Sequence, residues 1–80
     1  MMRKPLGAFF EDLERSRGLP AGYLAKTRAI ESSNGKNLVN PNSSARGDFQ
    51  FIRSTAKAVG LRNPMDPYES AEKEIGRAHV

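Results

Sequence analysis

Apolar residues recur at helical spacing in several segments of this chain. In the first segment, positions i, i+3, i+4 and i+7 are occupied by Leu6, Phe9, Phe10 and Leu13. This stripe predicts an amphipathic helix with one face on a core, and Gly18 ends it. A second helix is predicted with Pro20 in its first turn and an end near Ser33, where Asn34-Gly35 favours positive φ.

The second half of the chain predicts two further helices. One runs from about Phe49 to Val59 and stops at Gly60. The other begins at residues 66–69, where Asp-Pro-Tyr-Glu supplies an N-cap, a proline at the first helical position and a glutamate at the third. Residues 35–47 are dominated by Asn, Pro, Ser and Gly and are predicted to form a loop. Four short helices and no convincing strand predict an all-α fold.

Length and composition limit the class of protein. Eighty residues suffice for one domain, which we divide into an N-terminal amphipathic helix (1–18) and a core (19–80). No apolar run approaches the roughly 20 residues of a membrane span, so we expect none. With no cysteine and one histidine, we expect no metal site.

The charge balance favours anionic partners. Thirteen basic and nine acidic residues give a net charge of +4, which suits nucleic acid, acidic lipid or an anionic cell-wall polymer. The basic residues are scattered, however, as they are on ordinary solvated faces. Because they do not gather on one helix, we expect no nucleic-acid partner, and a small basic DNA-binding protein remains an alternative.

One acidic residue stands where an apolar one is expected. The stripe of the second helix consists of Leu24, Thr27 and Ile30. Glu31 lies four residues after Thr27, in the last helical turn, where both the carbonyl end of the helix and burial disfavour a carboxylate. We expect these effects to raise the pKa of Glu31, as a general acid working near neutral pH requires. The alternative is that Glu31 turns to solvent or pairs with Arg28 or Lys36.

Five short motifs follow one another from this position. They are Glu31-Ser32, Gly47-Asp48-Phe49-Gln50, Ser54-Thr55-Ala56, Gly60-Leu61 and Asp66-Pro67. In order and spacing, over roughly residues 19–71, this series resembles the catalytic domain of the soluble lytic transglycosylases. The resemblance implies a lysozyme-like fold, of which this chain holds a partial domain of about four short helices.

The resemblance also implies an activity and a site. It makes Glu31 the single catalytic acid/base, Ser32 the residue that supports its carboxylate, and Gln50, with the backbone around Phe49, part of the glycan-binding groove. The family cleaves the β-1,4 bond between N-acetylmuramic acid and N-acetylglucosamine and leaves a 1,6-anhydro end, without metal, cofactor or water as nucleophile. Peptidoglycan glycan strands are therefore the expected partner.

The chain departs from the family pattern in several places. Asp48 stands where the family usually has an apolar residue; we interpret it as a helix cap, whereas a place in the groove would suit a water-using lysozyme mechanism. Arg53 replaces a common proline. The family's later tyrosine and asparagine are missing, so we expect a further chain or segment to complete the site. The alternative function is a catalytically silent peptidoglycan-binding or phage virion structural module.

The expected place of action is the cell wall or periplasm. Acidic residues at positions 11 and 12 interrupt the apolar start, so we expect no signal peptide. The protein would then reach the wall by lysis, by a secretion machine or within a phage particle, and the Gly-Asp-Phe-Gln-Phe segment resembles phage versions of the family.

Overall fold

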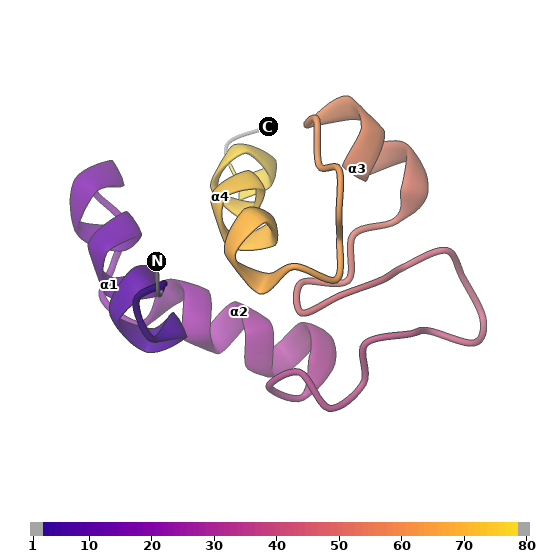
Figure 1. Ribbon diagram of the computed structural model, residues 1–80, viewed down its shortest axis with the longest axis horizontal. Helices are drawn as coiled ribbons and strands as arrows, with labels where there is room; N and C mark the ends of the chain where they lie inside the picture. Colours follow the sequence, from indigo (N-terminus) through magenta and orange to yellow (C-terminus); the bar gives the residue numbers. More distant parts are fainter. Residues whose placement is uncertain (1–2, 79–80) are drawn as a thin grey trace.

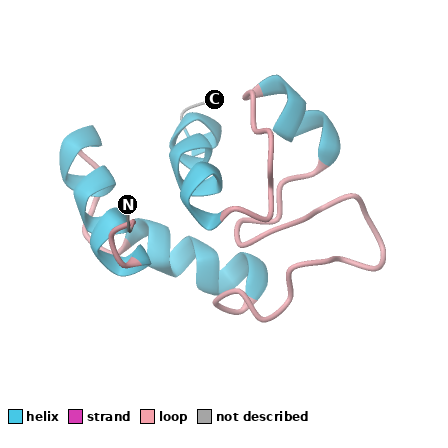
Figure 2. Cartoon of the chain, in the orientation of Figure 1, coloured by secondary structure: helices cyan, strands magenta, loops and turns pink. Residues whose placement is uncertain are grey.

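The computed structural model describes residues 3–78 and shows four helices joined by loops (Figure 1). They are α1 (Leu6–Arg17), α2 (Tyr23–Ser32), α3 (Arg53–Ala58) and α4 (Pro67–Ala78). In Figure 1, α4 lies between α1 and α3, and the loop that follows α2 extends away from α1. No strand forms within the described residues (Figure 2), which confirms the predicted all-α fold.

The predicted stripe of α1 faces the core. Phe10 is buried, and its ring meets the ring of Phe49 edge-on with centroids 5.8 Å apart. The other members of the stripe pack against the same cluster of buried residues: Phe10, Leu24, Phe49, Phe51, Ala56, Leu61 and Ala71. Burial of these apolar side chains is the main source of stability in a chain of this size. The core therefore joins α1 to both halves of the remaining chain.

Local signals set most helix ends. Gly18 adopts the left-handed conformation that ends α1, as predicted. Asn34 and Gly35 have positive φ after α2, also as predicted. The N-cap of α4 is confirmed by the Tyr68 N–H, which donates to Asp66 Oδ1 over 2.9 Å. Pro20, in contrast, lies in the turn before α2, where its carbonyl accepts the Tyr23 N–H.

The third helix is shorter than predicted. It begins at Arg53 rather than near Phe49, because the preceding residues are held by other backbone hydrogen bonds. Gln50 has a φ of 50° and donates its N–H to the Gly47 carbonyl, and the backbones of Arg46 and Phe51 pair as an isolated antiparallel bridge. Residues 47–50 therefore form a tight turn, which we call the 47–50 turn.

The spans of the helices exclude a transmembrane role for any of them. The longest, α1 and α4, have 12 residues each, which is too short to cross a bilayer. No helix in residues 3–78 is a candidate membrane span.

A buried carboxylate links α1 to the start of α2. Glu14 is 3% exposed, and its two oxygens accept the backbone N–H groups of Gly22 (3.1 Å) and Leu24 (2.8 Å). These N–H groups belong to the unsatisfied first turn of α2, where a negative charge is also favoured by the helix dipole. Glu14 thus caps a helix to which it does not belong.

Replacing Glu14 should uncap α2. We expect Glu14→Ala to lower the free energy of unfolding by about 1–3 kcal/mol, because the N–H groups of Gly22 and of buried Leu24 lose their acceptor. Urea unfolding measures the change. Glu11→Ala, at an exposed position of the same helix, is the matched control, and an equal loss in both variants would contradict the capping role.

Gly47 lies where the 47–50 turn touches the loop before α4. Its φ is +84°, and a Cβ built on it would come within 1.7 Å of the Pro64 carbonyl oxygen. This neighbour is backbone, so it cannot swing away as the end of a side chain would. The close approach of two main chains therefore requires glycine here.

A side chain at position 47 should be poorly tolerated. We expect Gly47→Ala to lower the free energy of unfolding by more than about 2 kcal/mol, through left-handed strain and steric overlap. Gly76→Ala is the control, because an added Cβ there meets no atom within 4 Å and α4 gains helix propensity. Chemical denaturation of both variants would refute this account if Gly47→Ala were as stable as Gly76→Ala.

Candidate functional site

Glu31 lies in the last turn of α2, and its side chain is 36% exposed. The prediction that it faces the core is therefore wrong. The buried residues of α2 are Leu24 and Ser32, with Arg28 half-buried between them, whereas Ile30 is 73% exposed. The core-facing stripe runs along positions 24, 28 and 32, and this places Glu31 at its accessible edge.

Glu31 also has an ionic partner that the sequence did not suggest. Its Oε2 lies 3.6 Å from Nη2 of Arg77, which comes from α4. The alternative interpretation, a solvent-exposed and ion-paired carboxylate, had named Arg28 or Lys36 as the partner. Arg28 instead pairs with Asp48. The environment of Glu31 therefore depends on α4, which begins only at Pro67.

Ser32 fastens the end of α2 to the 47–50 turn. Its side chain is buried, and its Oγ donates to the Asp48 carbonyl over 2.7 Å while accepting the Gly35 N–H over 3.0 Å. Its hydrogen bonds thus reach backbone groups and not the Glu31 carboxylate. In this structure Ser32 positions the turn beside Glu31 and offers no atom to a surface ligand.

Asp48 does not cap α3. That helix starts at Arg53 after an N-cap at Ile52, and the Asp48 carboxylate turns inward, where its Oδ2 lies 2.6 Å from Arg28 Nε. Asp48 is 4% exposed, so it does not point into a groove either. Gly35 packs directly on the pair: an added Cβ would lie 2.7 Å from Arg28 Nη2 and 2.9 Å from Asp48 Oδ2. Both interpretations of Asp48 made from the sequence are therefore wrong.

Gln50 and Phe49 make different contributions to the turn. The Gln50 amide Nε2 donates to the carbonyls of Leu38 (3.1 Å) and Gly47 (2.8 Å), which holds its half-buried side chain against the loop. The Phe49 side chain is fully buried, so its ring cannot contact a surface ligand. Its carbonyl accepts a hydrogen bond from Arg77 Nη2 over 2.9 Å. Only the backbone of Phe49 therefore belongs to the candidate site.

Arg77 connects the parts of this site, although no motif in the sequence pointed to it. Besides Glu31 and the Phe49 carbonyl, its guanidinium reaches Glu74, with Nε 2.6 Å from Oε2. Its Cζ also lies 4.2 Å from the centroid of the Phe51 ring, which is a cation–π contact. A single guanidinium thus joins α2, the 47–50 turn and α4.

Glu74 is the buried carboxylate of the site. Its side chain is 5% exposed, and its Oε2 has no aligned hydrogen bond among the described residues. Burial raises the pKa of Glu74, and nearby Glu31 adds to the increase, while Arg77 opposes it. The signal was present in the sequence: Glu74 lies beside Ile75 and three residues after Ala71, both buried. The burial beside apolar residues that we expected for Glu31 is found at Glu74 instead.

The arrangement offers one accessible and one buried carboxylate on a shared guanidinium. The accessible carboxylate, Glu31, can meet a ligand and exchange a proton with it. The buried one, Glu74, holds Arg77 in place, and its burial raises its pKa. Residues 3–78 contain no cluster of three or more acidic or histidine side chains suited to a metal ion.

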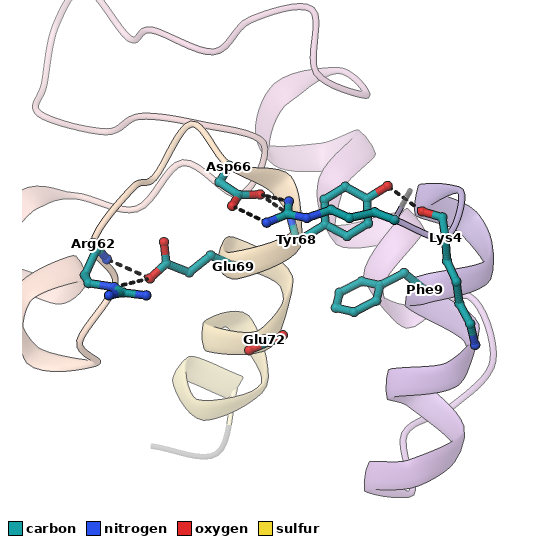
Figure 3. A pocket seen from close by; sticks show the side chains of 8 residues that line it. Lys4, Phe9, Arg62, Asp66, Tyr68, Glu69 and Glu72 are labelled. Atoms are coloured by element: carbon teal, nitrogen blue, oxygen red, sulfur yellow. Dashed lines mark hydrogen bonds and ion pairs between the residues drawn. The ribbon is translucent and has the colours of Figure 1, made fainter. Parts of the chain in front are cut away.

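The larger surface pockets lie away from Glu31. One of about 380 Å³ lies between the starts of α1 and α4 (Figure 3). There the Arg3 guanidinium pairs with Asp66 at 3.0 Å and lies over the Tyr68 ring, and it lowers the pKa of Asp66. The Glu69 carboxylate accepts the backbone N–H groups of Arg62 and Asn63, and these bonds lower its pKa. Most charged groups of this pocket therefore already have partners within the protein.

Comparison with known proteins adds no relative. No protein-family model, curated protein or solved structure was found to match the chain. The functional interpretation therefore depends on the motif resemblance and on the geometry of the residues around Glu31.

The raised pKa of Glu74 predicts a pH dependence of stability. The folded state binds the proton of the Glu74 carboxyl group more tightly than the unfolded chain does. The protonated group therefore stabilises the fold fully below the ordinary glutamate pKa of 4.5, and this contribution is lost as pH rises through the raised pKa. We expect the unfolding free energy of the wild type, relative to Glu74→Gln, to fall as pH increases. Urea unfolding between about pH 4 and pH 8 measures it.

The matched control for this experiment is Glu72→Gln, an exposed neighbour on the same helix. Its unfolding free energy should run parallel to that of the wild type over the same pH range. A wild-type advantage over Glu74→Gln that grows with pH would contradict the assignment.

Proposed function

We propose that this chain carries the acid/base site of a peptidoglycan lytic transglycosylase, with Glu31 as the general acid and then the general base. The observation that carries the proposal is the position of Glu31 at the accessible edge of α2, beside the 47–50 turn that Ser32 holds through the Asp48 carbonyl. Two of the motifs on which the resemblance rests, Glu31-Ser32 and residues 47–50, are thereby in contact through Ser32. The partner is the glycan strand of peptidoglycan, and the place of action is the cell wall.

The reaction needs one carboxyl group with access to the polymer. Protonated Glu31 donates its proton to the glycosidic oxygen as the bond from that oxygen to the anomeric carbon breaks. The resulting glutamate accepts the proton of the muramoyl 6-hydroxyl, whose oxygen forms the new bond to the anomeric carbon. The product is a 1,6-anhydro end, and no water is consumed. Because Asp48 is paired with Arg28, the 47–50 turn offers no second free carboxylate for a water-using mechanism.

Arg77 has to release Glu31 before the proton transfer. The two charged atoms are 3.6 Å apart and the Glu31 side chain is partly exposed, so the pair is worth little and opens at small cost. Arg77 keeps its contacts with Glu74 and the Phe49 carbonyl when it does so. The glycan strand, or a further chain or segment, would close the open side of the site.

A second candidate is a catalytically silent peptidoglycan-binding module, such as a structural part of a phage virion. The observation that favours it is the same ion pair, because Arg77 already contacts the carboxylate that the first step needs free to meet the glycan. Binding without cleavage would then be the whole activity.

Digestion of purified sacculi tests the proposal. The wild type should release muropeptides with 1,6-anhydro ends, detected by mass spectrometry, and Glu31→Gln should reduce the rate at least about 100-fold, because general acid catalysis is lost. Glu72→Gln, which removes an exposed carboxylate elsewhere, should keep the full rate. Sacculi that bind the wild type but yield no muropeptides would favour the silent module, and cleavage by Glu31→Gln at the wild-type rate would overturn the role of Glu31.

A further inference from the structure

A pocket lined by basic side chains shares Phe51 with the contacts of Arg77. It has a volume of about 360 Å³ and is formed by α3 together with the loops before and after this helix. Its basic lining residues are Arg46, Arg53, Lys57 and Arg62, and no acidic residue lines it. We call it the basic pocket.

Three of these cations lack an acidic partner. In residues 3–78, no carboxylate lies within salt-bridge distance of Arg46, Arg53 or Lys57, whereas Arg62 has Glu69 at 3.6 Å. Six of the thirteen lysines and arginines pair with described carboxylates, and of the other seven these three share one pocket. Arg53 and Lys57 are one turn apart on α3, a spacing at which like charges repel. A bound anion would relieve this repulsion.

The pocket presents groups with fixed directions as well as charge. Arg46 is held by its Nη1, which donates to the carbonyls of Ser43 (3.0 Å) and Ala45 (2.7 Å). The Ser44 hydroxyl oxygen accepts the Arg53 N–H over 3.0 Å, which leaves the hydroxyl hydrogen free to donate to a ligand. Guanidinium and hydroxyl groups in such a setting match the oxygens of an oxyanion.

Phe51 connects the basic pocket to Glu31. It lines the pocket, and its ring lies under Arg77, whose Nη2 is 3.6 Å from Glu31. Phe51 thus relates a ligand in the pocket to a polymer at Glu31 through a single guanidinium. In peptidoglycan, the groups that extend from the glycan beside the scissile bond are peptides that carry carboxylates.

We propose that the basic pocket binds a carboxylate of the peptide attached to the glycan strand. The oxyanion site itself follows from the lining residues, and only its assignment to peptidoglycan rests on the proposed function. Arg53 and Lys57 supply the exposed charges, while Arg46 and Ser44 supply hydrogen-bond donors in fixed positions. The pocket thus makes recognition depend on the peptide as well as on the sugar.

A titration of the ¹⁵N-labelled chain with muramyl dipeptide, followed by NMR, tests the proposal. The backbone amide signals of residues 44–46 and 53–57 should shift with muramyl dipeptide, which carries a free carboxylate, and stay in place with the amidated dipeptide, at constant ionic strength. Arg53→Gln/Lys57→Gln should weaken binding by at least about tenfold, because charge-assisted contacts are lost. Both positions are exposed, so the variant should remain folded, and circular dichroism checks this.

The matched control is Arg17→Gln/Lys26→Gln, which removes the same two types of charge from exposed positions outside the pocket. It should bind as the wild type does. Equal weakening in both double variants, or equal shifts with the amidated dipeptide, would overturn the proposal. Tighter binding of inorganic phosphate than of muramyl dipeptide would also overturn the carboxylate assignment and indicate a phosphate-bearing polymer, nucleic acid included.

The two proposals fail in distinguishable ways. Sacculi left uncut by a protein that still binds the carboxylate would count against the transglycosylase alone. Cleavage of sacculi by a protein whose pocket binds no oxyanion would overturn the pocket alone.

Discussion

The ion pair between half-buried Arg28 and buried Asp48 joins α2 to the long loop that follows this helix. Its charged atoms are 2.6 Å apart, and Asp48 is nearly inaccessible. Removing one partner of such a pair leaves an uncompensated buried charge, which typically costs about 3–5 kcal/mol. Ser32 and Gly35 close the same junction, the first by hydrogen bonds and the second by leaving space for the guanidinium. The positions of Glu31, the 47–50 turn and Arg77 relative to one another all depend on this junction.

Two carboxylates near the junction differ because their surroundings differ. Glu31 is at the edge of α2 and reaches solvent, whereas Glu74 is enclosed by α4 and the core, so burial raises its pKa. Arg77 contacts both, and it stacks on Phe51 at the same time. The division of roles follows: the accessible group can act on a polymer, and the buried group holds the guanidinium that reaches it.

The distribution of charge is more informative than the total. A net charge of +4 suggests little by itself, because scattered cations are common on solvated faces. Folding pairs some cations with carboxylates, such as Arg3 with Asp66, and leaves Arg46, Arg53 and Lys57 together around one cavity. Phe51, which also lines this cavity, lies against Arg77, the ionic partner of Glu31.

The helices and several of their ends could be predicted from the sequence, because spacing and capping act within one or two turns. The stripe of α1, the stop at Gly18, the positive φ at Asn34-Gly35 and the cap at Asp66 all follow from such local signals. The start of α3 could not be predicted in this way, since the 47–50 turn is held by contacts with Leu38 and Pro64. The motifs pointed to Glu31 and its neighbours. The burial of Glu74 and the pairing of Asp48 with Arg28, however, depend on how α2 packs against α4 and the 47–50 turn. Burial is a property of contacts between distant segments, and no local pattern contains it.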